Sequence, residues 1–199
     1  MRMTIPLIVL VLAAAILTGC SRSGGLPPTA PPSASATAPT APVSGSPTAP
    51  QGVKVLPGDQ KPNFTAKGVD GRDVKPTDYS GKILVLDFWA TWCAPCCKKL
   101  KEYQPMSAKY QDQGVQFLVF SLDDTAETAK GWAADNKVTI PMAMFDDSVQ
   151  SIFFPGDKSV TIPQVRILDR TGAWRYSMDS SSKVSDVENA IKALLAENK

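Results

Sequence analysis

The chain has 199 residues, a hydrophobic fraction of 43% and a formal net charge of +2 at pH 7. This is enough for one globular domain with a core, and the scattered charges form no basic stripe of the kind that binds nucleic acid. Histidine is absent, which excludes histidine catalysis, metal sites with histidine ligands and haem attachment through Cys-x-x-Cys-His.

The first residues have the features of an export signal. Arg2 provides a positive charge, and residues 5–17 form an apolar stretch too short for a comfortable membrane span. The stretch ends in LTGC at residues 17–20, which resembles the lipobox of bacterial lipoproteins, where the peptide is cut before a cysteine that receives diacylglycerol. The resemblance implies a signal peptide over residues 1–19 and an anchor in the lipid bilayer at Cys20. The alternative is an ordinary secretory signal with an incidental cysteine.

The next segment has the composition of a linker. Residues 21–50 are almost entirely Pro, Ala, Ser, Thr and Gly, with one charge at Arg22. Such a segment cannot bury enough apolar surface to offset the entropy lost on ordering, and its prolines favour extended conformations. We therefore expect residues 20–52 to contain the lipidated cysteine and a disordered tether, followed by a folded domain over residues 53–199.

Strand and helix patterns alternate in the folded part. The apolar run ILVLDFWA at residues 83–90 predicts a strand buried on both faces, and a helix is expected from residue 93 or 94 to about residue 113. The later elements are a strand over 115–121, a helix over 125–136, a strand over 140–145, a helix over 148–154, strands over 164–168 and 173–178 joined by a tight turn, and a final helix. Ser185 and Glu188 form a capping box that starts the final helix at Ser185. The order predicts an α/β fold with a central mixed β-sheet flanked by helices.

Three of the four cysteines lie in FWATWCAPCC at residues 88–97. Pro95 suits the first turn of a helix, where its missing amide is not needed, and this places Cys93 at the helix N-terminus. Free amides and the helix dipole stabilise a thiolate there. Cys96 lies about one turn further on the same face and can attack a mixed disulfide formed by Cys93, which is the minimal equipment for thiol-disulfide exchange.

The stretches FWATWCAPC, KYQDQGVQFLVFSLDD and VTIPQVRILDRTGAW resemble the thioredoxin superfamily, and residues 62–195 resemble its extracytoplasmic TlpA/ResA branch. The resemblance implies a thioredoxin-like fold and a monomeric thiol-disulfide oxidoreductase without cofactor or metal. In that family Cys93 would be the attacking cysteine and Cys96 the resolving one, and the pair would cycle between dithiol and disulfide.

The same resemblance assigns roles to further residues. Pro163 would be a cis-proline facing the disulfide, with the backbone of Ile162 pairing with the substrate; an ordinary trans proline is the alternative. Asp87 would be a buried proton relay to the resolving cysteine, or else a structural carboxylate at the end of its strand. The remaining substrate-binding surface would come from Trp92, Ala94 and Pro95. Many members of the branch carry Asn at the position of Asp87 and Glu at that of Lys99, so their acid-base details do not transfer directly.

Cys97 occupies a position that usually holds Lys or Arg in the family. It lies about 100° round the helix from Cys96 and should point away from Cys93. It could be a partly buried packing thiol, an alternative resolving or regulatory thiol, or a metal ligand. The last possibility gives the alternative function, a Cu(I) chaperone resembling the Sco proteins that uses Cys93 and Cys97. Sco proteins add a histidine ligand, which this chain lacks.

The sequence thus predicts an enzyme lipid-anchored outside the cytoplasm of a bacterium, on the periplasmic side in a Gram-negative host. Its substrates would be oxidised secreted or membrane thiol proteins, apocytochrome c among them. Asp87 and Ile162 favour the reducing direction, although a disulfide donor would use the same cysteines. The family implies a membrane thiol-electron donor of the DsbD/CcdA kind, because a reductase in an oxidising compartment needs electrons. A redox-inert adaptor is a third class, disfavoured by the intact cysteine pair.

Overall fold

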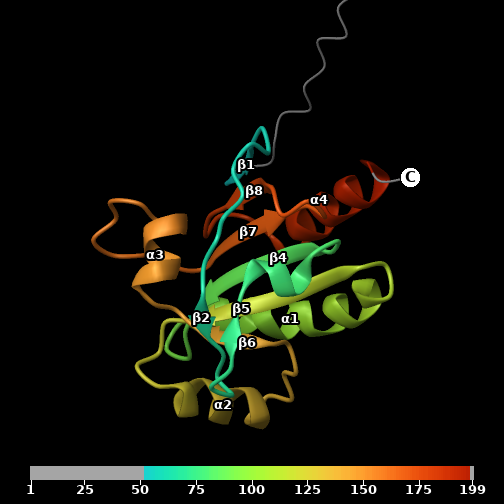
Figure 1. Ribbon diagram of the computed structural model, residues 1–199. Helices are drawn as coiled ribbons and strands as arrows, with labels where there is room; N and C mark the ends of the chain where they lie inside the picture. Colours follow the sequence, from blue (N-terminus) through green and yellow to red (C-terminus); the bar gives the residue numbers. More distant parts are fainter. Residues whose placement is uncertain (1–51, 198–199) are drawn as a thin grey trace, which may run out of the picture. The chain divides into compact units, whose positions relative to one another are not determined.

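A computed structural model describes residues 52–197 of the chain (Figure 1). The predicted signal peptide, the predicted lipidation site Cys20 and nearly all of the predicted tether lie outside the described residues. Within residues 52–197, no helix combines the length and the apolar character needed to cross a membrane.

Six strands form one mixed β-sheet. From one edge to the other they are β1 (Val53–Val55), β8 (Trp174–Met178), β7 (Gln164–Leu168), β4 (Ile83–Trp89), β5 (Val115–Ser121) and β6 (Met142–Met144). Strands β4, β5 and β6 are parallel, whereas β7 pairs antiparallel with β4, β8 with β7, and β1 with β8. This confirms the predicted central mixed sheet and its antiparallel hairpin.

Four helices flank the sheet on both faces. They are α1 (Ala94–Gln111), α2 (Ala126–Asp135), α3 (Asp147–Phe153) and α4 (Val184–Glu197). Successive side chains of a strand point to opposite faces, so Val85 and Phe117 pack in one core with α1, α2 and α4, whereas Leu86 and Phe120 pack in a second core with α3. Figure 1 shows α3 on the opposite side of the sheet from α1 and α4. The predicted α/β fold is therefore confirmed.

The structure adds elements that the sequence patterns do not predict. These are β1, the two-stranded sheet of β2 (Ala66–Lys67) and β3 (Asp73–Val74), and the short helix η1 (Pro76–Tyr79). Two or three residues of strand are too short to show a hydrophobic period. Strand β1 forms by pairing with the distant β8, whereas β2 and β3 pair with each other.

The predicted start of the final helix is wrong. Helix α4 begins at Val184, and the amide of Lys183 donates a 2.8 Å hydrogen bond to the carboxylate of Asp186. Ser185 therefore lies inside the helix, and the predicted capping box with Glu188 does not form. Glu188 instead accepts hydrogen bonds from Lys109 and the Tyr110 hydroxyl, both at 2.7 Å, because it faces α1. The residue joins α4 to α1.

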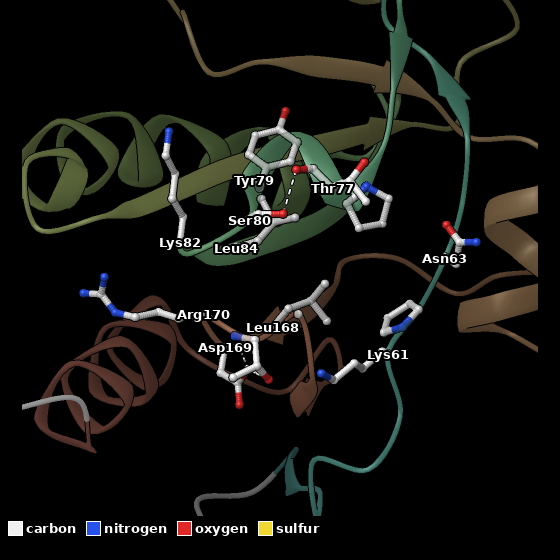
Figure 2. Close-up of a pocket in the computed structure, with 14 residues that line it drawn as sticks. Lys61, Asn63, Thr77, Tyr79, Ser80, Lys82, Leu84, Leu168, Asp169 and Arg170 are labelled. Carbon is white, nitrogen blue, oxygen red and sulfur yellow. Dashed lines mark hydrogen bonds between the residues drawn. The ribbon is translucent and has the colours of Figure 1, made fainter.

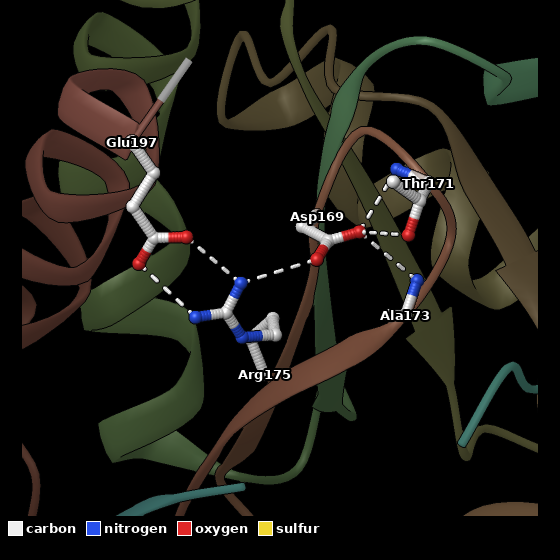
Figure 3. A network of polar contacts seen from close by, with 5 residues as sticks. All are labelled: Asp169, Thr171, Ala173, Arg175 and Glu197. Atoms are coloured by element: carbon white, nitrogen blue, oxygen red, sulfur yellow. Dashed lines mark hydrogen bonds and ion pairs between the residues drawn. The ribbon is translucent and has the colours of Figure 1, made fainter. Parts of the chain in front are cut away.

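Arg175 of β8 connects parts of the chain that are far apart in sequence (Figure 3). Its Nη1 donates to Asp169 at 3.2 Å, and its two terminal nitrogens bind the carboxylate of Glu197 at 2.8 and 3.0 Å. Asp169 also accepts hydrogen bonds from the amides of Thr171 and Ala173 in the turn between β7 and β8. The network joins this turn to the end of α4.

Candidate active site around Cys93 and Cys96

Cys93 and Cys96 lie where β4 gives way to α1. Cys93 is the N-cap of α1, Pro95 lies in its first turn, and Cys93 and Cys96 are joined by a disulfide. The amide of Cys96 donates to the Cys93 sulfur at 3.3 Å, and such a donor stabilises negative charge on the sulfur once the disulfide is reduced. Cys93 is 7% exposed, whereas Cys96 is fully buried. The predicted helix N-terminus is confirmed, and of the two cysteines only Cys93 keeps some exposed surface.

Exposed apolar side chains surround Cys93. Trp92 is 68% exposed, and Ala94 and Pro95 are exposed as well. An apolar rim around a reactive atom is typical of a surface that binds a partner. Three of the four residues assigned to substrate binding thus lie beside Cys93 in the chain.

The segment with Ile162 and Pro163 comes to the same end of β4. The peptide bond between them is cis, as the resemblance predicts. Gln164, the next residue, pairs with Phe88 of β4, so Pro163 lies level with the end of β4, a few residues before Cys93. Ile162 is half-buried and packs against the core that contains both cysteines. Strand register, which the sequence does not reveal, therefore brings two distant segments together.

Asp87 is fully buried on the side of the sheet that faces α1. Asp87 lies two residues from both Val85 and Trp89 along β4, so its side chain shares their face of the sheet. Val85 and Trp89 pack in the core that includes α1. Within residues 52–197, neither carboxylate oxygen of Asp87 has a hydrogen-bond partner. Burial raises the pKa of Asp87 well above its usual range, and the nearby charge of Lys99 offsets part of that rise. A raised pKa makes the Asp87 carboxylate a stronger base than an exposed aspartate, so it can take up a proton when a neighbouring group ionises.

Two residues of α1 complete the surroundings of Asp87. Lys99 is half-buried and donates a 2.7 Å hydrogen bond to the carbonyl of Ser182; burial lowers its pKa, and the charge of Asp87 raises it. Tyr103 is fully buried, and its hydroxyl has no partner among the described residues. Burial and then the charge of Asp87 raise the pKa of Tyr103. No motif in the sequence singles out Tyr103, although its position seven residues after Cys96 indicates the same helix face.

Cys97 is a free, half-buried thiol. Its sulfur lies 3.5 Å from the carbonyl oxygen of Thr91 and 3.7 Å from that of Ala90. Burial raises the pKa of Cys97, Lys101 counteracts the rise and Asp123 adds to it. These contacts favour a packing thiol, and a regulatory role stays a prediction. Across the part of the chain that the structure describes, no three or more His, Cys, Asp or Glu side chains gather as a metal site.

Two open cavities lie away from the cysteines. One of about 410 Å³ lies between η1 and the turn after β7, with Leu84 and Leu168 among its lining residues (Figure 2). These two residues are at the end of the strands opposite to Cys93. The other, of about 610 Å³, lies between the β2–β3 sheet, α2 and β6. Neither is lined by a cysteine, so both are separate from the candidate site.

Comparisons with known proteins identify the family of the chain. The family model described as AhpC/TSA family matches residues 57–177. The chain is 30% identical over 137 residues to a thiol-disulfide oxidoreductase ResA of Bacillus thuringiensis, covering 69% of this chain and 78% of the relative. A ResA of Geobacillus thermodenitrificans is 25% identical over 141 residues, covering 70% and 79%.

Solved structures show the same fold. A putative thiol:disulfide interchange protein DsbE from Chlorobium tepidum superposes with a TM-score of 0.60 at 26% identity, covering 71% of this chain and 99% of that one. A secreted thiol-disulfide isomerase from Corynebacterium glutamicum gives a TM-score of 0.64 at 19% identity, covering 76% and 96%, and this likeness concerns the fold alone. The chain belongs to the AhpC/TSA family and, within it, to the ResA-like thiol-disulfide oxidoreductases with a thioredoxin-like fold.

Proposed function

We propose that the protein is a lipid-anchored, extracytoplasmic enzyme that reduces disulfides of secreted or membrane thiol proteins, apocytochrome c among them. The observation that carries the proposal is the Cys93–Cys96 pair at the N-terminus of α1. It is supported by the difference in exposure between the two cysteine residues and by the buried Asp87 on the α1 side of the sheet, which has no hydrogen-bond partner among residues 52–197.

The reaction begins from the reduced pair. The Cys93 thiolate attacks one sulfur of the client disulfide, a Cys93–client bond forms, and the other client sulfur leaves as a thiolate that takes up a proton. The Cys96 thiolate then attacks the Cys93 sulfur and expels the second client thiol. Two electrons pass to the client, and the enzyme is left with the Cys93–Cys96 disulfide. A membrane thiol-electron donor of the DsbD/CcdA kind would return two electrons.

Asp87 is proposed to assist the second step. Cys96 is fully buried, so water cannot readily remove its proton. A carboxylate with a raised pKa is a strong enough base to accept that proton as the thiol attacks, and Asp87 has such a pKa on the sheet face that packs against the core with Cys96. Because Lys99 acts on Asp87 electrostatically, it would favour the ionised form that acts as a base.

The client is proposed to bind over the exposed rim. Trp92, Ala94 and Pro95 offer apolar contacts beside Cys93, and the backbone of Ile162 before cis-Pro163 would pair with an extended client segment. Backbone pairing is insensitive to side-chain identity, so the enzyme would accept several clients.

A trapping experiment tests the function. The reduced full-length protein, purified in detergent, is mixed with an oxidised secreted protein that contains one disulfide. The reaction is stopped by alkylating free thiols, and the masses of the products are measured by mass spectrometry. We expect one client dithiol for each Cys93–Cys96 disulfide formed. Cys96→Ser should accumulate a mixed disulfide between Cys93 and the client, and Cys93→Ser should form none. Failure of the unmodified protein to reduce the client, or a mixed disulfide through Cys97, would contradict the proposal.

Anchoring is tested separately. The full-length protein and Cys20→Ser are expressed in a bacterium, and membranes are separated from soluble extracts. We expect the unmodified chain in the membrane fraction with a diacylglycerol mass on Cys20. An equal distribution of the two proteins would indicate that Cys20 is not the anchor.

A further inference from the structure

Arg166 is a buried cation on the sheet face opposite to the cysteines. It is 4% exposed, and its guanidinium lies over the rings of Phe154 at 4.8 Å, Trp174 at 5.5 Å and Phe88 at 5.8 Å. No ion pair involves Arg166 within residues 52–197. The aromatic faces compensate in part for lost hydration, but burial still lowers the pKa of Arg166 to about 10. An apolar side chain would fill this space at lower cost, so the guanidinium calls for an explanation.

The hydrogen bonds of Arg166 lead towards Ile162. Nη2 donates to the side-chain oxygen of Gln164 at 2.6 Å, and the Gln164 amide nitrogen donates to the carbonyl of Thr161 at 2.8 Å. The two bonds span Ile162 and Pro163. Nη1 donates to the carbonyls of Val165 and Met178 at 3.0 and 3.3 Å, which fixes the guanidinium against β7 and β8.

The same guanidinium also holds the other end of the loop. The connection between α3 and β7 begins after Phe154, whose ring covers Arg166, and ends at Gln164, which Arg166 binds. Residues 155–159 are all exposed, and the Gln150 side chain donates a 2.8 Å hydrogen bond to the carbonyl of Asp157 in their middle. Arg166 links the two ends of this exposed segment, where such a bond does not reach.

We propose that Arg166 is a positioning residue that fixes the loop over residues 155–163, so that the Ile162 backbone is ready to pair with a polypeptide client. The inference rests on the proposed function. A loop ordered in advance does not lose its entropy when the client binds. Arginine suits the role because its planar group donates in three directions at once, whereas an apolar residue donates in none.

Comparing a polypeptide client with a small disulfide distinguishes loss of loop positioning from a general loss of activity. Both need Cys93, but only a polypeptide can pair with the Ile162 backbone. The assay measures kcat/KM of the full-length protein in detergent, under dithiothreitol turnover, with a disulfide-linked polypeptide and with bis(2-hydroxyethyl) disulfide, which has no peptide groups. The ratio of interest is kcat/KM for the polypeptide divided by kcat/KM for the small disulfide. Arg166→Met should lower this ratio about tenfold, mainly by raising the KM for the polypeptide. Gln164→Leu should lower the ratio in the same direction, and it carries the test alone should Arg166→Met not fold.

Arg175→Met is the matched control. It removes another partly buried arginine, from the network of Asp169 and Glu197 in Figure 3, which has no contact with Gln164. Its ratio should equal that of the unmodified protein, whatever its stability. An unchanged ratio in both Arg166→Met and Gln164→Leu, or an equal fall in Arg175→Met, would overturn the positioning role. An unmodified protein that reduces neither disulfide would instead overturn the proposed function itself.

Discussion

Replacing Asp87 by Asn keeps the shape of the side chain and removes its ionisable proton. The carboxyl group is fully buried, and neither oxygen has a hydrogen-bond partner among residues 52–197. Burial is the main cause that raises the pKa of Asp87, and Lys99 offsets only part of it. The folded protein therefore carries a group whose charged form is costly, and Asp87→Asn should make the protein more stable.

The size and sign of the effect follow from proton linkage. The Asn side chain stays as unpartnered as the Asp it replaces, so the gain comes from removing the ionisable charge. A rise of one pH unit in the pKa of Asp87 costs the folded state about 1.4 kcal/mol once pH exceeds the folded pKa, and we expect Asp87→Asn to raise the free energy of unfolding at pH 7 by about 2 kcal/mol. For a domain of this size, that is a rise in Tm of about 4–8 °C. Between the unfolded pKa of Asp, about 3.9, and the raised folded pKa of Asp87, the folded state binds more protons than the unfolded state. Stability of the unmodified protein therefore falls as pH rises through this window, and the gain from Asp87→Asn grows.

Urea unfolding at several pH values measures this directly. Tryptophan fluorescence reports unfolding, because Trp89 is buried and its ring lies 4.8 Å from that of Trp132. Both proteins are kept fully oxidised, so that the disulfide contributes equally. Equal stability at pH 7, together with parallel pH dependence from pH 4 to pH 8, would show that the account of Asp87 as a costly buried acid is wrong.

The other predictions concern activity and one helix contact. Asp87→Asn should slow turnover at neutral pH by about 10²-fold in the client reduction assay, as expected for loss of a general base; an unchanged rate would leave Asp87 without a catalytic role. Cys93→Ser should abolish activity and Cys97→Ser should keep most of it, whereas equal inactivity of the two would make Cys97 essential. Lys99→Met should raise the pKa of Asp87 further, so the pH profile of kcat should move to higher pH; a move to lower pH would refute the coupling. Hydrogen bonds from Lys109 and Tyr110 hold the pKa of Glu188 at about 2, so ionised Glu188 should stabilise the folded protein at pH values above the pKa of Glu in the unfolded chain. Glu188→Gln should therefore lower Tm at pH 7 by about 1–3 °C, and this difference should shrink as pH falls towards 2. A Tm difference that is independent of pH would contradict this role of Glu188.

The sequence predicts those parts of the fold that depend on neighbouring residues along the chain. Strands β5 and β7 match their predicted ranges, because their apolar runs are long enough to show burial. Strand β6 is shorter than predicted, since only Met142–Met144 pair with β5. The start of α4 differs because Asp186 and Glu188 are both possible capping residues, and only contact with α1 decides that Glu188 turns away.

The residues of the candidate site that form a local motif can be predicted from the sequence, whereas those that depend on packing cannot. Cys93, Cys96 and Pro95 form one continuous motif, and the helix N-terminus follows from it. Arg166 could not be found from the sequence, because nothing in a strand pattern shows that a charged residue will be buried among rings from three other segments. Tyr103 could be placed on the face of Cys96, but its unpartnered hydroxyl depends on the packing around it.

The reduction potential of the Cys93–Cys96 couple decides whether the protein acts as a reductase. The full-length protein in detergent is equilibrated with dithiothreitol or glutathione buffers, and peptide mapping identifies the cysteines that pair. The account predicts a reversible Cys93–Cys96 couple with a low potential, near the value of about −270 mV typical of thioredoxin. A potential near about −120 mV, typical of strong oxidants, would reverse the direction of the reaction. The absence of a reversible Cys93–Cys96 couple would contradict the proposed mechanism altogether.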